Sequence, residues 1–145
     1  MLGELLKAIK TRWAAKSMGS SFAGGIHEGQ APPSTALPFV VYTVVGSSNT
    51  SRATSSGDNK FQQYETATID FMITSRLGLS KASDLAETLK AAFDNAVMTL
   101  ANGVTMKKFW YVGESVEDDP DHTNVKEWTI TYQSILEQSR TLVNQ

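Results

Sequence analysis

The chain has 145 residues, of which 41% are hydrophobic and 19% are charged, and its formal net charge is −2. This composition is typical of a globular protein, and we expect one domain over residues 1–145 that is long enough to bury its own core. A charge so close to neutral does not favour a nucleic-acid-binding patch or an anionic membrane surface. The chain contains no cysteine, which excludes disulfides, thiolate nucleophiles and cysteine zinc sites.

The N-terminal segment is expected to be part of the folded domain. Its apolar residues are interrupted by charges, whereas a secretion signal needs an unbroken apolar region. No apolar run approaches the roughly 20 residues of a membrane-spanning helix. We therefore expect a soluble product, made in the cytoplasm, with no membrane partner.

Apolar residues near the start of the chain recur at helical spacing: Leu2, Leu5, Leu6, Ile9 and Trp13. This spacing predicts an amphipathic helix of about four turns that ends near residues 16–19. The polar side of this helix is too weakly basic for a membrane-surface helix, so we expect it to pack on the core.

Residues 20–36 have no hydrophobic period and contain Gly24-Gly25 and Pro32-Pro33, which predicts a loop with a short extended piece around Ile26. We expect His27 to be a solvated loop residue. The next segment, from Phe39 to Val45, is apolar on both parities, which predicts an inner strand covered on both faces.

Residues Gly46–Lys60 are rich in Ser, Thr, Asn and Gly, and we expect a long flexible loop there. The segment is much longer than the roughly 2–5 residues that a hairpin needs. Two interpretations stay open: a loop that is disordered in the monomer and orders against a partner, and a passive loop. Arg52 is almost its only positive charge, so a nucleic-acid arm is a poor fit.

Residues 61–97 predict a long strand followed by a helix that packs across it. The apolar residues of one strand parity are Phe61, Ala67, Ile69, Phe71 and Ile73, and we expect them to form the dry face. After a turn, Ser80 is expected to cap a helix. Its apolar stripe is predicted to be Ala82, Leu85, Ala86, Leu89, Phe93, Ala96 and Val97.

Two further strands are predicted, Val104–Gly113 and Val125–Leu136, separated by an acidic loop at Ser115–Thr123 and followed by a polar tail at Glu137–Gln145. The resulting fold class is α+β. We expect a two-layer sandwich of about four mainly antiparallel strands, with two helices on one face and long inter-strand loops.

The acidic loop is the one stretch whose side chains resemble metal ligands. It lacks the glycine and the closing glutamate of a calcium loop, and the chain has only two histidines, His27 and His122. We therefore interpret the loop as a solvated acidic turn. No nucleophile elbow or phosphate-binding loop is present, and Glu65 and Asp70 point to opposite faces of their strand. We predict no catalytic, cofactor-binding or metal site, and hence no enzyme.

The polar strand faces are the unusual feature of the chain. One consists of Tyr64, Thr66, Thr68 and Asp70, and the other of Glu127, Thr129, Thr131 and Gln133. Such faces can be solvated, or they can pack on a neighbouring subunit, because non-obligate interfaces are about as polar as ordinary surface.

The order of motifs resembles a known family. The N-terminal helix is followed by Gly-Gly-Ile-His-Glu-Gly-Gln-Ala-Pro and Leu-Pro-Phe-Val-Val-Tyr. A long loop, a Phe-Gln…Ile-Asp-Phe strand and a Ser-Asp-Leu-Ala-Glu-Thr-Leu helix come next, and then Glu-Asp-Asp-Pro-Asp before a strand with Trp128 and Tyr132. Over roughly Leu2 to Leu136 this is similar to the tail completion proteins of long-tailed double-stranded DNA bacteriophages, also described as tail terminator or head–tail joining proteins.

The resemblance implies a structural virion protein without catalytic residues. Family members form a ring, usually a homohexamer, that caps the tail tube and docks it to the head connector, or neck. DNA would pass through the lumen without sequence-specific binding, which suits a nearly neutral chain. The alternatives are a tail tube protein, a head–tail connector (neck) ring protein, or an enzyme of unknown type.

From the polar faces and the two long loops we predict a set of subunit contacts. The candidates are Ser48, Asn49, Arg52, Ser56, Asp58, Tyr64, Thr66, Thr68, Asp70, Glu117, Asp118, Asp119 and His122.

Overall fold

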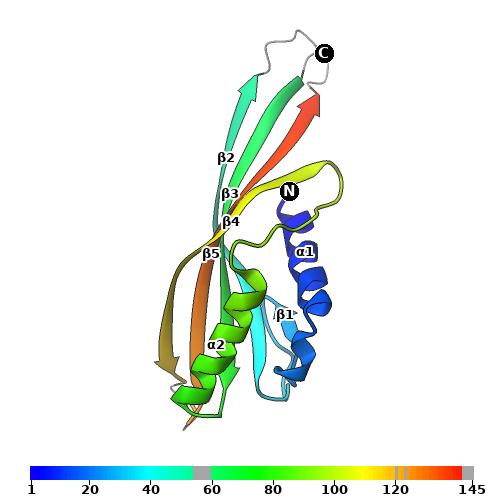
Figure 1. The fold of residues 1–145 in the computed structure, drawn as a ribbon. Coiled ribbons are helices and arrows are strands. Elements are labelled where there is room, and N and C mark those ends of the chain that lie inside the picture. Colours follow the sequence, from blue (N-terminus) through cyan, green and yellow to red (C-terminus); the bar gives the residue numbers. More distant parts are fainter. Residues whose placement is uncertain (54–59, 120, 123, 142–145) are drawn as a thin grey trace.

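The computed structural model describes residues 1–53, 60–119, 121–122 and 124–141 (Figure 1). Its elements in chain order are α1 (Leu2–Ala15), a short 3-10 helix (Met18–Ser20), β1 (Ile26–Glu28), β2 (Phe39–Ala53), β3 (Lys60–Ser75), α2 (Leu79–Phe93), β4 (Val104–Asp118) and β5 (Lys126–Thr141). The α+β class is confirmed. The five strands form one mixed sheet in the order β1-β2-β3-β5-β4, with β1 parallel to β2 and the other neighbours antiparallel. This is one strand more than predicted, because the extended piece at Ile26 pairs with β2.

The sheet is long and strongly twisted, and both α-helices lie beside its lower part in Figure 1. Alternate residues of β3 pack with the apolar stripes of the two helices into one hydrophobic core. On β3 the buried apolar residues are Ala67, Ile69, Phe71 and Ile73, as the alternation predicts. Phe71 lies at the centre of this core, with its ring centroid 4.9 Å from that of Phe93 and 5.6 Å from that of Tyr132.

Four strands extend beyond the bounds that the sequence pattern predicts. β2 continues to Ala53 and β3 begins at Lys60, so the prediction of a loop over Gly46–Lys60 is wrong for residues 46–53 and 60. Residues 54–59 lie outside the described part. Pairing with β3, from Ser47 opposite Ala67 to Ala53 opposite Phe61, supplies backbone partners that outweigh the weak strand propensity of this segment.

The same effect lengthens the strands on the other side of β3. β5 pairs with β3 as far as Thr141, so residues 137–141 are strand and not tail, while residues 142–145 lie outside the described part. β4 continues to Asp118, which shortens the predicted acidic loop to residues 119–125.

Both ends of α2 differ from the prediction. The helix begins at Leu79 after Gly78, whose φ of +85° favours glycine, and Ser80 makes no capping hydrogen bond. The helix ends at Phe93, and Asn95 takes a left-handed φ of +51°. The chain therefore leaves the helical path before Val97, which is 85% exposed and not part of the apolar stripe.

The start of β2 is covered on both faces, but its continuation is not. Val40, Val41 and Tyr42 are buried where β1 pairs with them, as predicted for an inner strand. Val45 lies at a β-bulge beyond β1 and is 56% exposed, so the prediction is wrong there. Before β2, a Cβ atom on Gly24 would lie 1.9 Å from the carbonyl oxygen of Ala36, so only glycine fits this close approach.

Candidate functional site

The polar side chains of β3 and β5 lie together on the face of the sheet opposite to the helix-packed side chains. We call this surface the open face: Tyr64, Thr66, Thr68, Asp70, Glu127, Thr129, Thr131 and Gln133, all of which are half-buried. Thr131 Oγ1 donates a hydrogen bond to Asp70 Oδ1 at 2.6 Å, and Gln133 Nε2 donates to Thr68 Oγ1 at 3.3 Å. These bonds join the two strands into one polar surface.

The predicted contact residues of β2 divide between the two faces. Ser48 pairs with Thr66 and shares the open face, whereas Asn49 pairs with Glu65, which is buried on the helix side. The backbone of Arg52 pairs with Gln62 near the upper end of the sheet. Ser56 and Asp58 lie outside the described residues.

The acidic turn lies at the opposite end of the sheet from these residues (Figure 1). Asp119 Oδ1 accepts the backbone N–H of Asp121 at 2.8 Å, and His122 Nδ1 lies 3.3 Å from Asp119 Oδ2. The bond from the Asp121 backbone is the main reason that the pKa of Asp119 lies below its usual value, and His122 adds to it. Asp118 pairs with Lys126, and Glu117 lies opposite Glu127 in the ladder.

These contacts agree with a solvated acidic turn, since Asp121 and His122 are exposed. The structure therefore brings Ser48 together with the Thr66 end of the open face and places Glu117 beside Glu127 at the other end of that face. Glu117, Asp118, Asp119 and His122 thus lie about a strand length away from Ser48.

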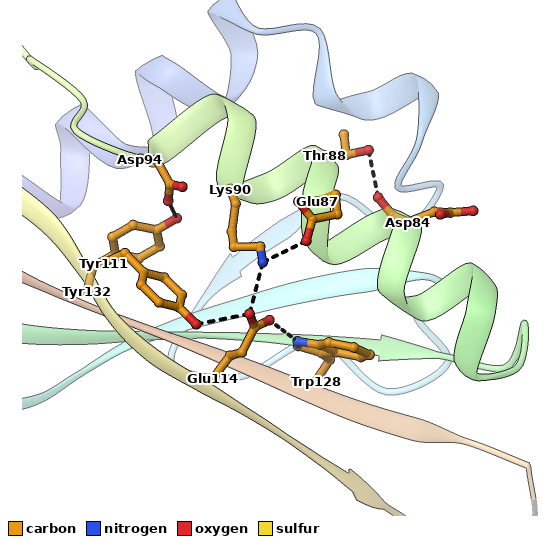
Figure 2. A network of polar contacts seen from close by, with 9 residues as sticks. All are labelled: Asp84, Glu87, Thr88, Lys90, Asp94, Tyr111, Glu114, Trp128 and Tyr132. Atoms are coloured by element: carbon orange, nitrogen blue, oxygen red, sulfur yellow. Dashed lines mark hydrogen bonds and ion pairs between the residues drawn. The ribbon is translucent and has the colours of Figure 1, made fainter.

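A polar network that the sequence analysis missed joins α2 to the edge strand β4 (Figure 2). Glu114 Oε1 accepts hydrogen bonds from Lys90 Nζ at 2.9 Å and from Tyr111 at 3.0 Å. Its other oxygen accepts a bond of 2.6 Å from the indole N–H of Trp128. Lys90 also contacts Glu87 at 2.7 Å.

The network shifts the protonation of its members. Burial acts to raise the pKa of Glu114, but the bonds from Lys90, Trp128 and Tyr111 outweigh it and the pKa falls below its usual value. The bonds to Glu87 and then to Glu114 raise the pKa of Lys90. Nearby, Tyr132 donates a hydrogen bond to Asp94, and burial raises the pKa of the tyrosine. The network thus holds charged groups in fixed positions between helix and sheet.

No sequence signal could have found this network. Lys90 and Glu114 are 24 residues apart and meet only because α2 returns along β4. Glu114 itself fell between a predicted strand and a predicted loop, where no partner could be assigned to it.

The two histidines have structural partners. The ring nitrogen Nε2 of His27 lies 2.8 Å from the carbonyl oxygen of Gly24, which makes this nitrogen the donor. His122 and Asp119 line a surface recess of about 350 Å³ together with Arg76 and Ser34. Ser34 makes no hydrogen bond to His122, so this recess lacks the nucleophile–base contact of covalent catalysis.

Metal and membrane features are also absent from the part of the chain that the structure covers. Within residues 1–53, 60–119, 121–122 and 124–141, no three His, Asp or Glu side chains come together as metal ligands. Among the helices in these ranges, none combines the length and the hydropathy of a membrane span.

Comparison with known proteins defines the class to which this fold belongs. Residues 7–137 match the model of the family described as tail completion protein gp17, which makes the chain a structural protein of a phage tail. The chain belongs to the tail completion protein gp17 family, in agreement with the order of its motifs. Its place is therefore in the virion, in association with other virion proteins.

Solved structures share the fold. A chain of the structure described as "Virion of native gene transfer agent (GTA) particle" has a TM-score of 0.70 and 12% identity, over 94% of this chain and 96% of that chain. A second solved chain, without a functional description, has a TM-score of 0.52 and 16% identity over 99% of both chains. At these identities the likeness shows the fold alone. No curated protein matches the sequence.

Proposed function

We propose that this protein is the subunit of a homohexameric ring that caps the tail tube and joins it to the head connector. The observation that carries the proposal is the family match over residues 7–137. It is supported by the fold shared with a chain of a gene transfer agent virion. The subunit would be made in the host cytoplasm as one domain and then enter the particle.

The polarity of the open face suits a subunit that is made soluble and assembles later. We infer a two-layer subunit, with both helices on one face of the sheet and the open face left for contacts. A face of threonine, glutamine and carboxylate side chains tolerates water before assembly, and non-obligate interfaces have similar polarity. The acidic turn, at the Glu127 end of the open face, would then contact a different neighbour, the tail tube protein or the neck protein.

The charge of the chain suits a passage for DNA. A lumen rich in Lys and Arg would bind phosphates and retain the duplex. The formal net charge of −2, from 13 basic and 15 acidic residues, provides no excess of cations for such retention.

Deletion of the gene from the phage tests the proposal. We expect particles in which filled heads and tails are separate, with normal joining restored by the gene supplied in trans. A tail tube protein gives a different result, because its deletion abolishes the tubes themselves. Normal, infectious virions in the deletion strain would contradict the structural role.

A double substitution of His27 and His122 by alanine separates the structural role from an enzymatic one. Complementation by this variant should restore joining as well as the wild-type gene does, because neither histidine is assigned a chemical step. Because His122 is also a predicted subunit contact, failure of the folded double variant to complement would favour an enzyme only if His27→Ala alone fails as well.

A further inference from the structure

Each of the two edge strands of the sheet has a long stretch to whose outer side no other strand is paired within the described residues. β4 is the last strand of the sheet, and within the described residues no strand pairs with its outer side. At the other edge β1 pairs only with Val40, Val41 and Tyr42, so β2 is open from Thr43 onward. Open strand edges present unpaired N–H and C=O groups and are ready to pair with another strand.

The open parts of the two edges lie at the same level of the sheet. Val44 pairs with Ile69, and Tyr111 pairs with Tyr132, which itself pairs with Ile69. Further along the sheet, Ser48 pairs with Thr66. Thr66 pairs with Ile135, and Ile135 pairs with Lys108. Residues 43–50 of β2 and 105–113 of β4 therefore lie level with one another on opposite sides of the sheet.

Both open edges contain β-bulges. The extra residue of β2 is Val45, between the pairs of Val44 and Gly46, whereas β4 has two extra residues, Lys107 between the pairs of Met106 and Lys108 and Val112 between those of Tyr111 and Gly113. Residues 43–48 and residues 108–113 each contain one extra residue, so these two stretches have equal length and end at the same levels of the sheet.

The open stretches carry little protection against pairing. Edge strands are normally blocked by charges or proline, yet residues 43–50 of β2 contain neither. On β4 the acidic residues Glu114, Glu117 and Asp118 lie below the matching stretch. Within residues 105–113 there are two lysines: Lys107 is already paired with Glu137, with 2.8 Å between Nζ and Oε2, and Lys108 Nζ lies over the Trp110 ring, 4.8 Å from its centroid.

From these observations we propose that residues 43–48 of one copy pair with residues 108–113 of a second copy, which extends the sheet from subunit to subunit. The inference rests on the proposed ring and names the contact that builds it. β2 and β4 run in opposite directions, because three antiparallel pairings separate them, so copies placed side by side pair antiparallel.

Because the open edges of β2 and β4 lie at the same levels of the sheet, we assign a second copy of this chain as the partner that pairs with each edge. Side-by-side copies keep the open face continuous across the contact, with Ser48 of one copy opposite Lys108 of the next. The contact uses two different surfaces of the subunit, so it is heterologous and generates a ring when its rotation closes.

Engineered cysteines test the contact, because the chain has no cysteine of its own. The double variant Ser48→Cys with Lys108→Cys is supplied in trans to the deletion phage, and purified particles are oxidised and run on a non-reducing gel. We expect the monomer band to be replaced by a ladder of larger species, since disulfides form only where Cα atoms lie about 4.4–6.8 Å apart.

Three controls define the result. Each single-cysteine variant should remain monomeric, and particles that contain a mixture of the two single variants should stop at dimers. The pair Ser48→Cys with Val97→Cys, in which Val97 is 85% exposed but lies in the loop after α2, should give no ladder. If the first double variant does not fold, Gly46→Cys with Trp110→Cys tests the same register at the neighbouring level of the open face.

The possible outcomes separate this inference from the proposed function. Particles that assemble with the protein at the head–tail junction, but show only monomers for both cysteine pairs, would overturn the edge pairing and leave the ring intact. A ladder that is equally strong with the Val97 control pair would also overturn it, because that contact is then not specific. A deletion strain with normal virions contradicts the proposed function, whatever the gels show.

Discussion

Replacement of Phe71 by alanine tests the arrangement on which the fold depends. This side chain is fully buried on β3, at the point where the strand meets α2 and β5. Its ring lies 4.9 Å from Phe93, 5.6 Å from Tyr132 and 6.2 Å from Tyr42, measured between centroids. Truncation to alanine removes all three aromatic contacts at once and leaves a cavity that these rigid rings cannot fill.

We expect the variant to lose about 3–5 kcal/mol of the free energy of unfolding, the usual effect of truncating a buried aromatic residue. The aromatic pairs contribute roughly 0.5–1.5 kcal/mol each beyond area burial, which places the expected loss in the upper part of that range. Phe71→Leu keeps most of the volume and should cost less, about 1.5 kcal/mol.

Urea unfolding, followed by far-UV circular dichroism, measures the loss as a lower midpoint at an unchanged slope. Thr66→Ala on the open face of the same strand is the matched control and should change stability by less than about 0.5 kcal/mol. A loss below about 1 kcal/mol for Phe71→Ala, together with a large loss for Thr66→Ala, would mean that the two strand faces are exchanged, since a slip of one residue inverts them.

Other substitutions test individual contacts. The pKa of Glu114 is lowered in the fold, so its bonds stabilise the protein at neutral pH and this contribution is lost as the pH falls below the usual value of 4.5. Glu114→Gln should therefore lower Tm at neutral pH and show a smaller further decrease on acidification than wild type, and parallel Tm–pH curves would refute the charged network. Gly24→Ala should cost about 1–3 kcal/mol in urea unfolding because its Cβ would clash with Ala36. The control Gly19→Ala, with open space around it, should cost much less, and equal effects would contradict the close approach. Val97→Ser should change the unfolding free energy by less than about 0.5 kcal/mol, and a larger loss would mean that the residue is buried.

The local periodicities of the sequence predict the elements well. Alternation on β3 identified the side chains of Ile69, Phe71 and Ile73 as buried, and helical spacing identified Leu5 and Ile9 on α1. The structure confirms these predictions because each pattern depends on one helix or strand that packs on a single core.

Features that depend on pairing between distant segments could not be predicted. The Ser- and Thr-rich end of β2 has weak strand propensity by itself, and it is a strand because β3 lies beside it. Val97 follows the helical spacing of α2 but lies beyond the turn at Asn95, so periodicity alone placed it wrongly. The Lys90–Glu114 contact likewise exists only through the return of α2 along β4.

The candidate site shows the same division. Strand parity predicted the polar face of each strand, but the contacts among Thr68, Asp70, Thr131 and Gln133 exist because β3 pairs with β5, which the sequence did not predict. The level match between the two sheet edges depends on the strand order and on the bulges, and neither feature has a sequence signature that could reveal it.

The position and copy number of the protein in the virion are the most direct test of whether it forms a ring at the head–tail junction. Cryo-electron microscopy of purified particles, with wild-type protein compared with a version carrying a small C-terminal tag, should place the density of the tag at the head–tail junction. We expect a single ring there and no copies along the tail. Tag density repeated along the tail would identify a tube protein, and a particle without any tag density would contradict the proposed role of the protein in the virion.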